Sequence, residues 1–354
     1  MARYLGDYLD NLGLETKYQR HSNGRENIIA ILKGDGSGKN LMINGHLDTV
    51  GIGGMQNPFS AEIRDGKIYG RGAFDMKGGI VSSVAAIESI IKSNIKLKGD
   101  VILCFVTDEE YGSRGTEISL EEYSADAGII CEPTDSEIII AHKGFIWVEI
   151  AVYGMAAHGS MPEKGVDAII NAGKVLVELD NLQNGSWKKL IHPLLGNPTL
   201  HASTIDGGLG ISTYPDKCTF SIEIRTLPNQ TDKMVENDLL AIFDKLSMND
   251  HQFKAELKVT LSRQPLEVQT DETVVRLLAK AREEVISKAP TFTGVPYWTD
   301  AALLFEKGIP TVLIGPDGDG AHAAVEYVEI ESVENIAKIL EKVVLEFCGM
   351  TEIS

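Results

Sequence analysis

The chain has 354 residues, and its 43% hydrophobic and 24% charged content is that of an ordinary globular protein large enough for two domains. Its formal net charge of −18 argues against a nucleic-acid or anionic-membrane partner, because both require clustered positive charge. Membrane insertion is not expected either, since no uncharged apolar run approaches the roughly 18 residues of a spanning helix. Four widely spaced cysteines without a Cys-x-x-Cys motif, and an N-terminus without a signal-peptide pattern, indicate a cytoplasmic protein with reduced thiols.

Short apolar segments alternate with helical patterns along most of the chain. Strands are predicted at residues 27–32, 41–44, 101–106, 127–130 and 311–314. Helices are predicted at residues 4–12, 80–91, 272–285, 299–306 and 332–347. The glycine-rich linker 33–39 lacks two residues of a phosphate-binding loop, so a hairpin turn is predicted there. Apolar strands that alternate with helices predict an α/β sheet with buried central strands.

The pattern changes between about residues 144 and 264. The predicted order there is strand-helix-strand-strand-helix-strand, at residues 145–152, 167–179, 200–205, 218–226, 234–246 and 253–261. This order is the split βαβ, or ferredoxin-like, arrangement. We therefore expect a discontinuous first domain, residues 1–143 and 265–354, interrupted by an inserted domain, residues 144–264.

Acidic and histidine side chains recur where predicted strands end. Asp75 lies in the glycine-rich stretch 70–79, directly before a predicted helix. The residues that follow the ends of strands are His46, Glu109, Glu110, Glu132 and His322. Ligands of α/β sheets bind beyond the carboxyl ends of the strands, so these side chains can converge.

Two histidines and several carboxylates suit zinc, which takes imidazole nitrogen and carboxylate oxygen. Five ligands are too many for one tetrahedral catalytic site that keeps a water, but they suit two ions that share one carboxylate. Asp75 is the candidate bridge, because its loop can present both oxygens. Two ions about 3.5–4 Å apart hold a bridging hydroxide and polarise a neighbouring carbonyl.

The acidic pair Glu109 and Glu110 can divide the catalytic work. One of them would bind metal, and the other would face the water as general base and later protonate the leaving nitrogen. Asp48, two residues beyond His46, is placed to accept the other ring N–H of that histidine. Taken singly, an acidic pair is usually solvated surface and a histidine after a strand is usually structural. Their joint placement at strand ends favours a metal site.

These motifs resemble those of the co-catalytic zinc hydrolase family that includes acetylornithine deacetylase, succinyl-diaminopimelate desuccinylase and carboxypeptidase G. The matching segments run in family order over nearly the whole chain: HLDTV at 46–50, YGRGAFDMKGG at 69–79, DEE at 108–110, EPT at 132–134, AHGS at 157–160, RTLP at 225–228 and AH at 321–322. The resemblance implies a zinc-exopeptidase-like α/β/α catalytic domain with an inserted ferredoxin-like (βαββαβ) dimerisation domain. Compared with the family, the chain begins about one helix later.

The resemblance also assigns roles within the metal site. It implies that one zinc takes His46 and Glu132, that the other takes Glu110 and His322, that Asp75 bridges them, and that Glu109 is the general base. Cobalt or manganese could replace zinc, because carboxylate-rich two-metal sites accept both. A cis peptide bond after Asp75 is implied as well.

Three residues of the inserted segment match substrate-binding positions of the family. His158 matches a histidine that reaches the active site of the partner subunit and stabilises the tetrahedral intermediate. Arg225 matches an arginine that holds the substrate carboxylate, a task suited to a bidentate guanidinium. Ser212 stands where the family usually carries a substrate-binding asparagine. The alternatives are a structural His158 beside a hairpin and a surface Arg225 that pairs with Glu223 or Asp216.

The resemblance implies removal of an acyl group from an N-acyl amino acid, since Glu132 matches the deacylase and carboxypeptidase type. A dipeptidase or carboxypeptidase on the same centre is the first alternative, and an inactive relative that binds metal or amino acids is the second. The expected partners are a small N-acyl amino acid or short peptide and a second copy of the chain. Asp300 resembles a substrate-side aspartate of the family, although capping of a helix explains it equally well.

Overall fold

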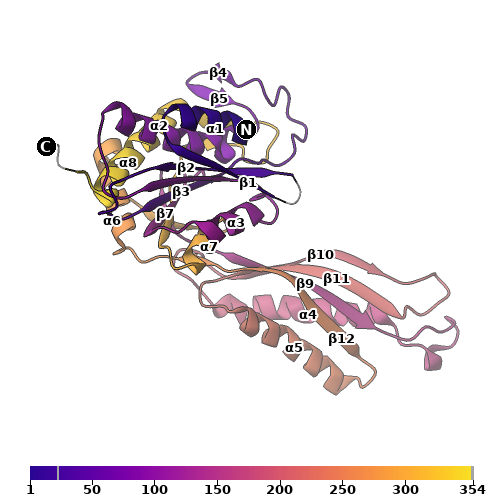
Figure 1. The fold of residues 1–354 in the computed structure, drawn as a ribbon. Helices are drawn as coiled ribbons and strands as arrows, with labels where there is room; N and C mark the ends of the chain where they lie inside the picture. Colours follow the sequence, from indigo (N-terminus) through magenta and orange to yellow (C-terminus); the bar gives the residue numbers. More distant parts are fainter. Residues whose placement is uncertain (22–23, 352–354) are drawn as a thin grey trace. The chain divides into compact units, whose positions relative to one another are not determined.

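The computed structural model describes residues 1–21 and 24–351 (Figure 1). The chain divides into two compact units: unit 1 comprises Met1–Ile140, Val268–Thr293 and Thr299–Ser354, and unit 2 comprises Ala141–Glu267 and Gly294–Trp298. The segment Gly294–Trp298 lies outside the insertion expected from the sequence. It belongs to unit 2 because the Trp298 ring packs edge-on against Phe145 and its Nε1 donates a hydrogen bond to the Gln264 carbonyl oxygen.

The core of unit 1 is a mixed sheet in which the parallel strands are buried. Its strand order is β1 (Glu15–Arg20), β2 (Glu26–Leu32), β6 (Val101–Val106), β3 (Leu41–His46), β7 (Ala127–Ile130), β15 (Thr311–Leu313) and β8 (Ile138–His142). Strands β6, β3, β7 and β15 run parallel, and every residue of these four strands is buried. Strand β8 also pairs with β13 (Leu266–Glu267) and β14 (Phe292–Val295). Burial on both faces explains why these strands read as continuous apolar runs.

Helices cover both faces of this sheet, as the α/β/α expectation requires. They are α1 (Ala2–Asn11), α2 (Gly78–Lys92), α3 (Arg114–Glu122), α6 (Thr273–Ile286), α7 (Ala301–Glu306) and α8 (Ile330–Cys348). Figure 1 shows α1, α2 and α8 on one face and α3 and α7 on the other. Helix α6 packs against α8, which in turn packs against α2.

A small antiparallel sheet in unit 1 was not predicted from the sequence. Its strand order is β16 (Gly318–Asp319), β17 (Tyr327–Glu329), β5 (Lys67–Tyr69) and β4 (Glu62–Arg64). Strands of two or three residues are too short to show a period of two. The pairing of Tyr69 with Tyr327 places the segment before Asp75 beside the segment after His322.

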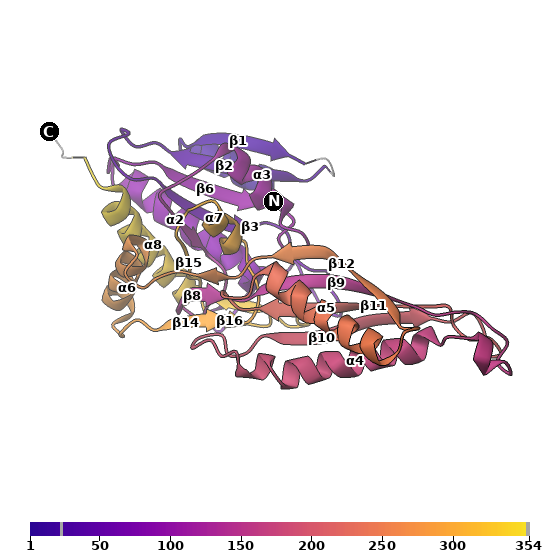
Figure 2. The same ribbon diagram turned by 90° about the horizontal axis from the view of Figure 1, so that it is seen from below.

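Unit 2 has the predicted strand-helix-strand-strand-helix-strand order. Its elements are β9 (Gly144–Tyr153), α4 (Ala168–Asn184), β10 (Thr199–Gly207), β11 (Lys217–Thr226), α5 (Asp232–Asn249) and β12 (Lys254–Arg263), and the sheet order is β10-β11-β9-β12. Both helices lie on one face of the antiparallel sheet (Figure 2), where alternate residues of β9 and β11 form the core with them. The Asp167 carboxylate and the Thr231 hydroxyl cap α4 and α5 by accepting from Ile170 N and Met234 N.

The predicted hairpin at the linker 33–39 is wrong. Strands β2 and β3 are not neighbours, because β6 lies between them and pairs with both. The linker instead hydrogen-bonds through the amides of Asp35 and Gly36 to the carbonyl oxygens of Leu97 and Lys98. None of the helices within residues 1–21 and 24–351 combines the length and the apolar character needed to cross a membrane.

Candidate metal centre

Asp75 lies in a short turn, η1 (Ala73–Lys77), that leads directly into α2. The peptide bond between Asp75 and Met76 is cis, as the resemblance implies. Gly72 precedes the turn with a φ of 78°, a conformation that L side chains rarely adopt. A Cβ at Gly72 would also collide with the Lys77 ammonium and the Thr49 methyl group. The local sequence GAFD therefore needs glycine at this position.

One oxygen of Asp75 belongs to a buried group with His46 and Glu132. His46 is the last residue of β3, and Glu132 comes two residues after the end of β7. Nε2 of His46 lies 3.0 Å from Asp75 Oδ1 and 3.7 Å from Glu132 Oε1. Nδ1 of His46 lies 3.0 Å from the main-chain carbonyl oxygen of Asp48. A carbonyl can only accept, so Nδ1 carries a proton, and Nε2 is the ring nitrogen that faces the carboxylates and is left for a cation.

The other oxygen of Asp75 belongs to a second group with Glu110 and His322. Nε2 of His322 lies 3.0 Å from Asp75 Oδ2 and 3.1 Å from Glu110 Oε2. Glu110 is oriented by its second oxygen, which accepts a hydrogen bond from Val50 N at 3.0 Å. The potential ligand atoms within each group lie within 4.8 Å of one another. The structure thus brings together all five residues that the sequence singled out as ligands.

The electrostatics of both groups favour a bound cation. Burial raises the pKa of Glu132 to about 8; the Asp75 carboxylate acts in the same direction and His46 opposes both. Burial disfavours the charged form of His46, but Glu132 and Asp75 outweigh it and raise the pKa of His46 well above its usual range. Burial and Asp75 also raise the pKa of Glu110. Three carboxylates and two imidazoles at this spacing are a donor set that fits two divalent ions of the zinc, cobalt or manganese type.

Glu109 is half-buried beside these groups, but within the described residues it belongs to neither of them. Burial raises the pKa of its carboxyl well above the usual range; His46 opposes this shift and Glu132 reinforces it. The Asp48 carboxylate accepts long hydrogen bonds, at 3.4 Å, from Glu109 N and Glu110 N. Asp48 therefore differs from the sequence-based expectation: its main-chain oxygen contacts His46 Nδ1, while Oδ1 lies 3.8 Å away.

Asp300 is buried at the start of α7. The structure does not support helix capping as its role, because its side chain makes no capping hydrogen bond with the described residues. Oδ2 accepts a hydrogen bond from Thr116 Oγ1 at 2.6 Å, and Oδ1 has no partner within the described part of the chain. Burial raises the pKa of Asp300 to about 6, against the opposing effect of Thr116.

The predicted substrate-binding residues His158, Ser212 and Arg225 belong to unit 2. His158 and Ser212 lie on adjacent loops, because Gly159 N donates to the Ser212 carbonyl oxygen at 2.8 Å. Nδ1 of His158 accepts a hydrogen bond from Ser160 N at 3.2 Å, so a neutral His158 carries its proton on the exposed Nε2. Nε of Arg225 donates to Glu223 Oε1 at 2.7 Å, the pair that the alternative interpretation anticipated.

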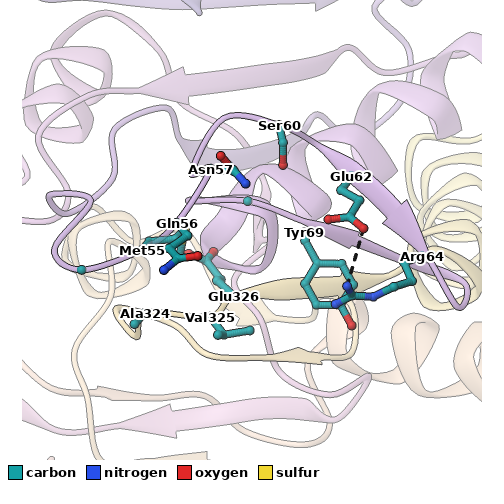
Figure 3. Close-up of a pocket in the computed structure, with 12 residues that line it drawn as sticks. Met55, Gln56, Asn57, Ser60, Glu62, Arg64, Tyr69, Ala324, Val325 and Glu326 are labelled. Carbon is teal, nitrogen blue, oxygen red and sulfur yellow. Dashed lines mark ion pairs between the residues drawn. The ribbon is translucent and has the colours of Figure 1, made fainter.

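Sequence reasoning missed Glu326 and gave Arg71 no role. Glu326 is fully buried four residues after His322, and it lines one wall of a pocket of about 450 Å³ (Figure 3). The opposite part of that pocket carries the Arg64–Glu62 ion pair. No residue of the two ligand groups is among the described residues that line the pocket. A lone buried acid without periodic context offers no signal in the sequence.

Comparison with known proteins places these features in a family. The profile of peptidase family M20/M25/M40 matches residues 42–346. An acetylornithine deacetylase from Myxococcus xanthus is 30% identical over 97% of this chain and 87% of its own. Among solved structures, aminopeptidase PepT from Bacillus cereus superposes with a TM-score of 0.81 at 22% identity, over 98% of this chain and 92% of its own. A dinuclear metal binding peptidase from Bacillus subtilis superposes with a TM-score of 0.73 at 18% identity, over 98% of this chain and 91% of its own.

The fold and the clustered histidines and carboxylates are those of a metal-dependent hydrolase that acts on amides. The chain belongs to peptidase family M20/M25/M40.

Proposed function

We propose that the protein is a two-metal amidohydrolase that removes the acyl group from an N-acyl amino acid. The carrying observation is that the two oxygens of Asp75 each lie 3.0 Å from the Nε2 of a different histidine, His46 and His322. A bridging carboxylate needs this geometry, and an isolated ion pair does not. Zinc is the proposed ion, with cobalt or manganese as chemically acceptable substitutes.

When bound, two such ions would polarise the substrate carbonyl and lower the pKa of a water molecule. Glu109 would then accept a proton from the attacking water and return it to the leaving nitrogen. Burial raises the pKa of Glu109 from its usual value, which is the direction that helps a carboxylate to take up a proton and return it. Asp48 would hold the backbone at Glu109 and Glu110 through its two amide contacts.

Residues of unit 2 would bind the remainder of the substrate. Nε of Arg225 donates a hydrogen bond to Glu223. This contact would orient the guanidinium so that its terminal nitrogens can hold the substrate carboxylate. His158 would donate from Nε2 to the oxygen of the tetrahedral intermediate in the active site of the partner subunit. Ser212 would contact the substrate from the loop beside His158, because its carbonyl oxygen accepts a hydrogen bond from Gly159 N.

This arrangement requires a homodimer, and the surface of unit 2 supports one. Strand β10 is an edge strand whose residues are almost all exposed. Ile170 and Val177 on the neighbouring helix α4, and Ile205 on β10, expose apolar side chains. An unpaired edge next to exposed apolar residues is suited to association with a second copy. We further propose a cytoplasmic location, because all four cysteines are free and buried.

Hydrolysis of a small substrate panel tests the proposal. We expect chelator-sensitive cleavage of at least one of N-acetylornithine, N-succinyl-diaminopimelate and N-acetylmethionine, and none of two dipeptides. Cleavage of the dipeptides alone would assign a peptidase to the same centre. A protein that binds two metal ions but cleaves none of the five compounds would contradict the deacylase proposal for these substrates.

A further inference from the structure

A buried ion pair lies directly behind the metal-ligand loops of unit 1. The side chains of Glu326 and Arg71 are 0% and 3% exposed, and Arg71 Nη1 donates to Glu326 Oε2 at 2.6 Å. The two residues are 255 positions apart in the sequence. Buried ion pairs are weak contributors to stability, because desolvation offsets their attraction. Their placement therefore calls for another explanation.

The Glu326 carboxylate holds the backbone of the turn that carries Asp75. Oε1 accepts from Phe74 N at 3.0 Å and from Asp75 N at 3.1 Å, and Oε2 accepts from Gly72 N at 3.0 Å. With Arg71, one carboxylate accepts four hydrogen bonds. Only a carboxylate can do this, because the amide nitrogen of a glutamine would face backbone N–H donors.

Arg71 extends the same contact to the loop that carries His322. Its Nη2 donates to the carbonyl oxygen of Ala323, the residue after His322, at 2.8 Å. Gly70 N donates to the Glu326 carbonyl oxygen at 3.1 Å, next to the pairing of β5 with β17. The Asp75 turn and the His322 loop are thus bound to one another by the pair.

The pair contacts one loop that both ligand groups share and one loop that belongs to the second group alone. Asp75 belongs to both groups, whereas His322 belongs only to the second, and the His322 side chain is 57% exposed, so packing restrains it little. In the first group, His46 is the last residue of β3 and Glu132 follows β7, and these two strands pair with each other within the buried sheet. The first group therefore shares the Asp75 turn with the second group, but only the second group also depends on the His322 loop, which the central sheet does not fix.

We propose that Glu326 and Arg71 act as positioning residues that set the distance between Asp75 and His322 and thereby the affinity of the second metal position. This inference rests on the proposed two-metal function, since it concerns the same centre. Neither residue touches the reacting atoms. Their effect passes through the backbone amides of residues 72–75 and the carbonyl of residue 323.

The test compares Glu326→Gln with Glu329→Gln, which removes the same charge three residues later from a side chain that is 44% exposed. Metal-free protein is titrated with Co²⁺ against a competing chelator, and visible absorption follows each equivalent. For Glu326→Gln we expect first-ion affinity near wild type and a roughly 10–100-fold loss at the second position, the usual cost of losing a residue that orients metal ligands. Glu329→Gln should bind like wild type.

Arg71→Lys provides a second variant in case Glu326→Gln folds poorly. The lysine keeps the positive charge beside Glu326, and the Glu326 carboxylate still accepts from the backbone amides. The hydrogen bond to the carbonyl oxygen of Ala323 is lost, so about tenfold weaker binding of the second ion is expected. Unchanged affinity for both ions in these variants would overturn the inference. So would equal weakening of both positions, because that result would indicate general structural support.

Hydrogen exchange of the metal-free protein separates this inference from the proposed function. Amides of residues 72, 74 and 75 should exchange about tenfold faster or more in Glu326→Gln than in wild type and Glu329→Gln. Unchanged exchange would overturn the inference whatever the metal content. A wild-type protein that binds fewer than two Co²⁺ ions would instead contradict the proposed function, and the exchange result would still decide whether Glu326 holds the turn.

Discussion

The main-chain carbonyl oxygen of Asp48 lies 3.0 Å from Nδ1 of His46 and fixes which imidazole nitrogen can face a cation. The contact uses the backbone, so the side chain of Asp48 is left for a different task. Its two carboxylate oxygens accept hydrogen bonds from the backbone amides of Glu109 and Glu110, each at 3.4 Å. Asp48 therefore connects His46, a proposed metal ligand, with the segment that carries the proposed general base.

Asp48→Asn separates these two contacts. The main-chain carbonyl remains, so we expect full metal content, while replacement of one oxygen by an NH₂ group disturbs the backbone at Glu109. Activity should fall about 10–100-fold, mainly in kcat, as for other residues that orient an active site. Metal analysis and steady-state kinetics on the best panel substrate check this. Loss of metal together with activity would show that the carboxylate supports His46 directly.

Glu109→Ala tests the general base. Its carboxylate lies outside both ligand groups of the described residues, so the variant should still bind two metal ions. Turnover should fall by about 10²–10⁴-fold or more, the usual contribution of general acid–base catalysis. Activity close to wild type with full metal content would remove Glu109 from the mechanism.

Mixed dimers test whether His158 acts on the partner subunit. His158→Ala and Glu109→Ala proteins should each be nearly inactive. When equal amounts are unfolded and refolded together, about half of the dimers would be mixed and each would hold one intact site, so about a quarter of wild-type activity should return. Separately refolded samples that are combined afterwards serve as the control. No recovery in the mixed sample would place His158 outside the catalytic site of the partner.

The clustering of the five candidate ligand residues could be predicted from sequence because their positions follow from local signals. His46 and Glu132 lie at or just beyond the ends of continuous apolar strands, and the parallel order of those strands brings their ends together. Asp75 stands between glycines before an apolar helix. Each of these signals spans fewer than about ten residues, so a single sequence carries it.

The features that could not be predicted depend on pairing between distant segments. The hairpin expected at the linker 33–39 failed because β6, some sixty residues further on, pairs with both β2 and β3. The contact of Glu326 with Arg71 likewise requires β17 to lie beside β5. In both cases the residues around one segment carry no pattern that identifies the distant segment with which it pairs.

His142 predicts an acid-dependent loss of stability. It is buried in unit 2, its Nδ1 donates to the Lys143 carbonyl oxygen at 3.0 Å, and burial lowers its pKa to about 4. An unfolded histidine has a pKa of about 6.5, so the unfolded state binds the proton more readily below that pH. The stabilisation is complete above about pH 6.5 and is lost as the pH falls toward 4, by about 2 kcal/mol between pH 7 and pH 5.

Urea unfolding at both pH values measures this effect. His142→Phe should lose the corresponding part of the pH dependence, whereas His251→Gln, at an exposed position, should keep it. An unchanged difference between pH 7 and pH 5 in His142→Phe would assign the acid sensitivity to other groups.

Gly72→Ala tests the steric requirement at the turn that carries Asp75. The residue has a φ of 78°, and a new methyl group would meet the Lys77 ammonium and the Thr49 methyl group. We expect a destabilisation of about 1–3 kcal/mol, since strained backbone costs this much at a non-glycine residue. Metal binding should weaken as well, because the turn must shift and Asp75 moves with it.

Gly173→Ala in α4 is the matched control, because its new Cβ would meet no atom within 4 Å. Alanine in place of glycine inside a helix should stabilise the protein by about 0.5–1 kcal/mol. Thermal unfolding with and without chelator measures both effects. A Gly72→Ala protein with wild-type stability and metal content would show that the turn can relax around the added carbon without moving Asp75.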